Sequence, residues 1–122
     1  TGIDTLNKIV ETVPRESKCH LIVRTLDSIL KAEAHGMGRS LSRRFSVFTY
    51  FRELANGRQE TFHGKYFVGD DIKAYVGSAN LLHASLESTV ETGVLLSGVD
   101  AKPWSVFAQA MLDSSEMVRV SR

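Results

Sequence analysis

Short apolar runs recur along the chain, separated by glycine, proline and polar residues. Their content of β-branched and aromatic residues is typical of strands. Strands are therefore expected at residues 19–24, 45–51, 61–68, 72–76 and 90–96. The sequence Gly69-Asp70-Asp71 favours a chain reversal, so the third and fourth runs are expected to pair as a hairpin.

Between these runs, apolar residues recur three or four positions apart, which is the spacing of one helix face. Helices are expected before Pro14, over residues 26–34, as a turn near 84–88, and at the end of the chain with Pro103 in the first turn. The final helix is expected to place its apolar stripe in the core: Trp104, Phe107, Ala108, Met111 and Leu112. The alternation predicts an α/β fold, in which a mixed β-sheet carries helices on both faces, as a single domain over residues 1–122.

The composition is that of an ordinary globular domain, with 43% hydrophobic and 24% charged residues. Cys19 is the single cysteine, so no disulfide can form within the chain, and a reducing, cytoplasmic setting is expected. No apolar run reaches the roughly 18 residues of a membrane span. A net charge of +1 favours no class of partner by itself.

The third and fourth runs carry most of the reactive side chains. The pattern H-x-K-x4-D-x6-G-S-x-N is formed by His63, Lys65, Asp70, Gly77, Ser78 and Asn80. Because alternate residues of a strand share a face, we expect the His63 imidazole to lie beside the Lys65 ammonium. The hairpin would bring Ser78 and Asn80 near both of them.

These residue types suit attack on a phosphodiester. A neutral imidazole at His63 can attack phosphorus and form a covalent intermediate that water later opens. Lys65 and the hydrogen-bond donors of Ser78 and Asn80 can stabilise the negative charge that grows on the phosphoryl oxygens. Glu91, at the start of the last apolar run, can accept the second ring N–H of His63 and fix its tautomer.

The pattern resembles the active-site signature of the phospholipase D superfamily, over roughly residues 60–98. The resemblance implies a phospholipase D-like half-domain that hydrolyses phosphodiesters through a phosphohistidine at His63, with no cofactor and no metal. The expected catalytic residues are His63, Lys65, Asn80 and Glu91. The residues expected to bind the substrate phosphate are Lys65, Ser78 and Asn80. Asp70 and Gly77 are expected to have structural roles in the motif.

Each of these residues also has an ordinary structural use. A lone histidine on a strand is usually a hydrogen-bonded structural residue, and serine after glycine is common in turns. The complete spacing, in its expected strand context, favours catalysis over that interpretation. The other histidines, His20, His35 and His83, have no spacing that marks one of them as a general acid.

Phosphoryl transfer through His63 calls for a second group that protonates the leaving oxygen, and a second histidine fits best. The chain holds one copy of the pattern. We therefore expect a second motif-bearing half to complete the site. It would be either an identical subunit across a two-fold axis, giving a homodimer, or a further segment of a longer protein.

Residues 36–73 hold seven Lys or Arg against four Asp or Glu, which suits a groove for a nucleic-acid backbone. A solvated loop is an equally good use of Arg43 and Arg44. Residues 77–82 and 91–96 resemble nuclease-type and defence-associated bacterial members of the superfamily, and the arginine typical of cardiolipin-synthase-like members is missing after Asn80. We expect a nuclease, with DNA favoured over RNA. The alternatives are a phospholipase or phosphatidyltransferase acting on phospholipids, and a non-catalytic nucleic-acid-binding module of a larger assembly.

Overall fold

The computed structural model describes residues 8–9, 11–24, 27, 44–61, 63–79 and 88–117. Contacts divide the chain into two compact units, and each is described by itself. The first, which we call the motif unit, consists of Thr1–Leu6 and Gly64–Asp113. The second, the parallel-strand unit, consists of Asn7–His63 and Ser114–Arg122.

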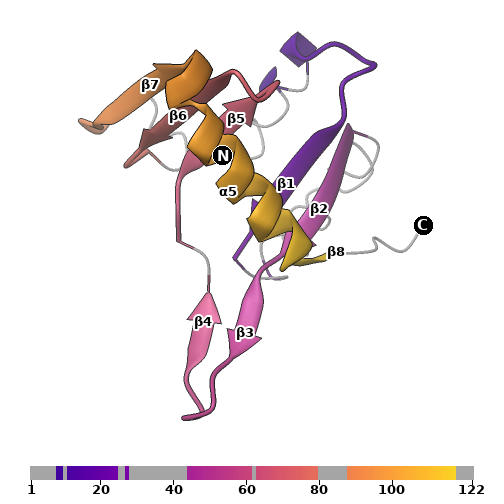
Figure 1. Ribbon diagram of the computed structural model, residues 1–122, viewed down its shortest axis with the longest axis vertical. Helices are drawn as coiled ribbons and strands as arrows, with labels where there is room; N and C mark the ends of the chain where they lie inside the picture. The colour runs from indigo at the N-terminus through magenta and orange to yellow at the C-terminus, as the bar shows by residue number, and fades with distance from the viewer. Residues whose placement is uncertain are drawn as a thin grey trace. The chain divides into compact units, whose positions relative to one another are not determined.

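The parallel-strand unit is built on two parallel strands, β1 (Cys19–Val23) and β2 (Phe45–Thr49) (Figure 1). A short strand, β8 (Glu116–Met117), pairs antiparallel with β2. Val47, on the central strand β2, is 3% exposed and belongs to the core of this sheet. The strands expected over residues 19–24 and at the start of residues 45–51 are confirmed.

The second apolar run breaks after β2, and its end belongs to a separate hairpin (Figure 1). Strand β3 (Phe51–Glu53) pairs antiparallel with β4 (Gln59–Thr61). Gly57 lies in the turn between them with φ of 76°, a conformation that glycine adopts without strain. The Tyr50 hydroxyl donates to the Glu60 carboxylate on β4, and this hydrogen bond raises the pKa of Tyr50.

The motif unit contains three antiparallel strands in the order β5-β6-β7, with β6 (Lys73–Gly77) between β5 (Tyr66–Gly69) and β7 (Gly93–Ser97). The turn from β5 to β6 has Asp70 and Asp71 in the left-handed region, with φ of 52° and 60°. Aspartate is one of the residues that tolerate this region, which mirror-image hairpin turns require at both central positions. The hairpin expected from the sequence is confirmed.

One face of this sheet, which we call the inner face, packs against α5 (Lys102–Asp113). Tyr66 on β5 lies with its ring centroid 5.7 Å from those of Trp104 and Phe107. Burial raises the pKa of Tyr66, and Ala74 at the centre of the sheet is 1% exposed. The expected final helix is confirmed, but its apolar stripe is only partly core, because Phe107 remains 44% exposed.

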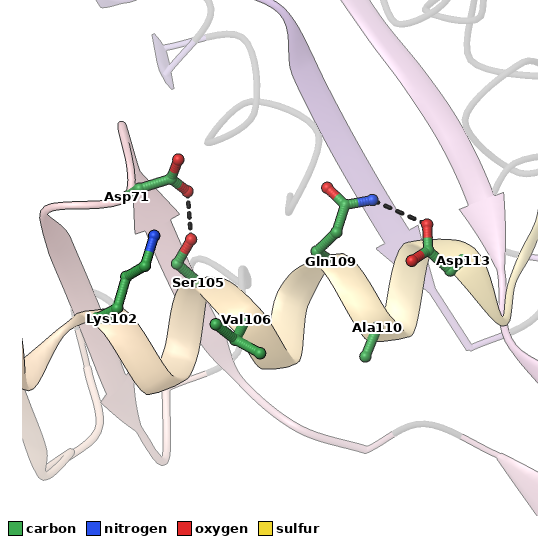
Figure 2. A pocket seen from close by; sticks show the side chains of 7 residues that line it. All are labelled: Asp71, Lys102, Ser105, Val106, Gln109, Ala110 and Asp113. Carbon is green, nitrogen blue, oxygen red and sulfur yellow. Dashed lines mark hydrogen bonds between the residues drawn. The ribbon is translucent and has the colours of Figure 1, made fainter.

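The start of α5 is joined to the β5–β6 turn by a side-chain hydrogen bond. Figure 2 shows the Ser105 hydroxyl donating to the Asp71 carboxylate. Ser105 is 8% exposed, so this bond satisfies a hydroxyl that burial has removed from water. The η1 turn (Gly98–Asp100) reaches the same region, where the Gly98 N–H donates to the Ile72 carbonyl at 2.8 Å.

One expected strand is wrong. Residues 61–68 do not form a single strand: β4 ends at Thr61, β5 begins at Tyr66, and His63, Gly64 and Lys65 lie between them without strand structure. The cause is a change of partner, since β4 pairs with β3 whereas β5 pairs with β6. The expectation that His63 and Lys65 project side by side from one strand face therefore fails.

The α/β class is confirmed, and the strands of the described residues are divided among three small sheets. The helix before Pro14 is helical where it is described, and the Val13 N–H donates to the Ile9 carbonyl at 3.1 Å. The helix expected at 26–34 lies outside the described residues except for Asp27, and the turn at 84–88 lies outside them except for Ser88. In the described part of the chain, no helix is long and apolar enough to cross a membrane.

Gly77→Ala is expected to lower the free energy of unfolding by about 1–3 kcal/mol, as overpacking does. An added Cβ would stand 2.4 Å from the Tyr75 Oη and 2.7 Å from the Thr92 carbonyl oxygen, and the carbonyl belongs to the backbone. Urea unfolding measures the effect. The matched control is Gly69→Ala, where nothing lies within 4 Å of the added atom. Equal losses in the two variants would show that the close approach at Gly77 is not tight.

Candidate active site

One end of the β5-β6-β7 sheet brings together three of the predicted site residues. Lys65 precedes β5, Ser78 follows β6, and Glu91 lies two residues before β7. The Gly77 N–H donates to the Lys65 carbonyl at 3.2 Å, and the Ser78 N–H donates to the Thr92 carbonyl at 2.9 Å. These bonds continue the pairing of β6 with both neighbours beyond the strand ends. Residues far apart in sequence are thereby aligned at this end of the sheet.

Glu91 is held in place by two hydroxyl groups. The Ser78 hydroxyl donates to the Glu91 Oε2, and the Thr89 hydroxyl donates to Oε1 at 2.9 Å. The Ser78 oxygen in turn accepts the Thr92 N–H at 3.1 Å. Hydrogen bonds to an ionised carboxylate are stronger than those between neutral groups. The half-buried Glu91 is therefore a fixed acceptor at the end of the sheet.

The sequence interpretation did not anticipate these hydroxyl contacts. Ser78 was expected to bind the substrate phosphate, which stays a prediction, and the structure shows its hydroxyl bonded to Glu91. Thr89 was not singled out. The available signal was its position two residues before Glu91, where a short hydroxyl side chain can reach a nearby group.

The structure describes some of the remaining predicted residues and not others. His63 is exposed and belongs to the parallel-strand unit, whereas Glu91 belongs to the motif unit, so their pairing stays a prediction. Asn80 lies outside the described residues. Asp70 occupies the β5–β6 turn, and Gly77 allows the close approach of Tyr75. In the described parts of the chain, no three His, Cys, Asp or Glu residues form a group that could hold a metal ion.

Two shallow hollows lie on the motif unit. One, of ≈ 420 Å³, adjoins Ser78 and is lined by Val76, Gly77, Ser78, Thr92, Gly93 and Val94. The other, of ≈ 470 Å³, runs along α5, and Figure 2 shows its side chains. In the α5 hollow, Ser105 is bonded to Asp71, and Gln109 to Asp113 at 2.9 Å. Of these two hollows, the one beside Ser78 adjoins the predicted site.

Comparison with known proteins agrees with this fold and motif. A family model described as "Cardiolipin synthase, PLD-like domain" matches residues 2–111. The chain therefore belongs to the phospholipase D-like domain family, as the motif had indicated. It has the fold of the superfamily's phosphodiesterases.

Among solved structures, NucT from Helicobacter pylori is similar to this chain with a TM-score of 0.58 and 16% sequence identity. The similarity covers 96% of this chain and 92% of that one. At this identity the likeness shows a shared fold. A search of curated proteins returned no match.

The bond between Ser78 and Glu91 can be measured by a double-mutant cycle. Ser78→Ala and Glu91→Ala are expected to be coupled by about 1 kcal/mol in the free energy of unfolding, because each removes the same charge-assisted bond. The matched control pairs Ser97→Ala with Glu91→Ala. Ser97 carries a hydroxyl at the opposite end of β7, so its coupling to Glu91 is expected to stay below about 0.3 kcal/mol. Additive effects of Ser78→Ala and Glu91→Ala would contradict the contact.

Proposed function

We propose that the protein is a phosphodiesterase that cleaves DNA through a phosphohistidine at His63, without a metal ion. The observation that carries the proposal is the alignment of Lys65, Ser78 and Glu91 at one end of the β5-β6-β7 sheet. It occurs in a chain of the phospholipase D-like family that retains every position of the motif.

In the proposed first step, a ring nitrogen of His63 forms a bond to phosphorus as the bond to the leaving oxygen breaks. A second imidazole gives that oxygen its proton. Water then attacks the phosphohistidine and gives its proton to the second imidazole, the N–P bond breaks, and both imidazoles return to their starting states. Lys65 and Asn80 stabilise the charge that develops on the phosphoryl oxygens in both steps. The positive charge and donors that a metal ion could supply thus come from side chains.

Glu91 is proposed to orient His63 by accepting its second ring N–H. The Glu91 Oε2 accepts from the Ser78 hydroxyl and Oε1 from the Thr89 hydroxyl, and a carboxylate offers about four lone-pair sites in all. The two hydroxyls fix the carboxylate before substrate arrives, which limits the reorganisation that the reaction requires. Ser78 is therefore proposed to act chiefly through Glu91.

The second imidazole is proposed to be His63 of another copy of the chain. One copy of the motif supplies a nucleophile but no opposed acid, and a two-fold axis places two identical motifs face to face. DNA is favoured as substrate by the basic segment at residues 36–73 and by the resemblance of residues 77–82 and 91–96 to nuclease-type members. The single cysteine, Cys19, favours a cytoplasmic setting.

A second candidate is transfer or hydrolysis at a phospholipid headgroup. It is favoured by the description of the matching family model, which names cardiolipin synthase, and by the valines that line the hollow beside Ser78. The sequence after Asn80 lacks the arginine typical of cardiolipin-synthase-like members. DNA cleavage is therefore the primary proposal.

His63→Ala is expected to abolish cleavage while leaving the fold intact, because the side chain is exposed and is the nucleophile. Lys65→Ala is expected to reduce kcat by about 10²–10³-fold, as loss of one transition-state donor does. The assay uses labelled single- and double-stranded DNA, RNA and phospholipid vesicles, each with EDTA. His20→Ala is the matched control, since His20 is an exposed histidine on β1. Cleavage that requires added Mg²⁺ or survives His63→Ala would contradict the mechanism, and turnover of vesicles alone would favour the lipid candidate.

Heterodimers of wild-type and His63→Ala chains are expected to be nearly inactive rather than half active. Each would retain one of the two imidazoles that a single shared centre needs. Two different affinity tags on co-expressed chains allow the heterodimer to be purified and its kcat measured. Half activity in the heterodimer, or full activity in a strictly monomeric protein, would contradict the shared site.

A further inference from the structure

The face of the β5-β6-β7 sheet opposite α5, which we call the outer face, carries an unusual row of side chains. The strand register places Phe67, Tyr75 and Leu95 side by side, one on each strand. Their neighbours Tyr66 and Ala74 belong to the inner face, where Tyr66 contacts α5. Phe67 is 41% exposed and Leu95 is 72% exposed, so apolar and aromatic surface faces solvent here.

Tyr75 lies over the backbone of two glycines. A Cβ added to Gly77 would stand 2.4 Å from the Tyr75 Oη, and one added to Gly93 would stand 2.4 Å from its Cε2. These two glycines are directly paired across β6 and β7. The ring therefore occupies the space that two side chains would fill, and it extends toward the sheet end that holds Ser78 and Glu91. Tyr75 itself is half-buried, so part of its side chain remains accessible to solvent.

Phe67 extends the aromatic surface from Tyr75 onto β5. The two ring centroids are 6.2 Å apart, and the ring planes are inclined by 46°. The two rings thus form a short platform that begins beside the candidate site and continues across the sheet.

Within its three strands, the outer face carries one positive charge, that of Lys73, and no negative charge. Its register positions on the three strands are occupied by Phe67, Gly69, Lys73, Tyr75, Gly77, Gly93, Leu95 and Ser97. The exposed Lys73 donates from its ammonium to the Ser97 hydroxyl at 3.2 Å, which confirms that these two side chains share the face. By contrast, the Asp71 carboxylate of the adjoining turn is bonded to Ser105 on α5. An aromatic surface beside a cation suits a ligand with planar rings joined by phosphates.

We propose that the outer face is a binding platform for single-stranded nucleic acid, on which Tyr75 stacks the base nearest the scissile phosphate and Phe67 stacks its neighbour. Exposed aromatic rings on a sheet recognise unpaired bases in this way, because every base offers a flat π-face. Lys73 lies on the same face, where it can attract the nucleic-acid backbone. Bases inside a duplex are stacked on each other, so the platform favours single strands or unpaired ends. This proposal rests on the proposed function and names its substrate class.

The test measures binding separately from cleavage by using His63→Ala protein. Fluorescence anisotropy gives the Kd for a labelled single-stranded DNA and for a duplex of the same sequence. Tyr75→Leu and Phe67→Leu are each expected to weaken single-strand binding by about 5- to 100-fold, with a smaller effect on the duplex. Tyr75→Phe keeps the ring and is expected to retain binding.

Phe107→Leu is the matched control, because Phe107 has a similar exposure of 44% but lies on α5. It is expected to leave the Kd unchanged. A second measurement requires no substitution on the platform: photo-crosslinking of bromodeoxyuridine-containing single strands, mapped by mass spectrometry, is expected to label Tyr75 or Phe67.

Single-strand binding that is unaffected by both leucine variants, with crosslinks elsewhere, would overturn the platform even if DNA is cleaved. Ring-dependent binding by a protein that cleaves no nucleic acid would instead refute the proposed function and leave the platform standing. Sedimentation of the same variants tests the alternative that a second copy of the chain binds the outer face. If Tyr75→Leu or Phe67→Leu converts a dimer into monomers, the outer face is a subunit interface and the proposal is wrong.

Discussion

The site depends on the pairing of one central strand with both of its neighbours. Strand β6 bonds to β5 on one side and to β7 on the other, and its pairing continues past the strand ends at Lys65 and Thr92. A single register therefore aligns the lysine, the Ser78 hydroxyl and the Glu91 carboxylate. A slip of one residue would turn every side chain of the slipped strand to the opposite face and separate these groups. The tight turn at Asp70 and Asp71 helps to fix that register.

The same register gives the two faces of the sheet different tasks. On the inner face, Tyr66 packs against α5 and Ala74 is buried, and both stabilise the unit by burying apolar surface. On the outer face, Gly77 and Gly93 leave room for the Tyr75 ring. Gly77 thus belongs to the motif and also makes room for the aromatic surface beside it. A larger side chain at Gly77 would disturb both the close approach of the Thr92 backbone and the position of the Tyr75 ring on the proposed binding surface.

The sequence was most informative where local chemistry decides the structure. The β5–β6 hairpin followed from Gly69-Asp70-Asp71 between two apolar runs, and α5 followed from its apolar spacing after Pro103. The break at residues 63–65 could not be predicted, because the run through Val68 is continuously strand-like and the change of partner from β3 to β6 is a tertiary effect. Family membership was predictable from the spacing alone, whereas the bonds from Ser78 and Thr89 to Glu91 depend on the pairing of β6 with β7.

The central claim is that His63 becomes covalently attached to the phosphate of the substrate. The most direct measurement is to quench the reaction in alkaline denaturant, which preserves phosphohistidine, after mixing the protein with DNA labelled on the side that stays attached to phosphorus. Peptide mapping by mass spectrometry then locates the label. The account predicts a transient adduct on the peptide that contains His63, absent from His63→Ala. Turnover without any adduct, or an adduct on another residue, would contradict it.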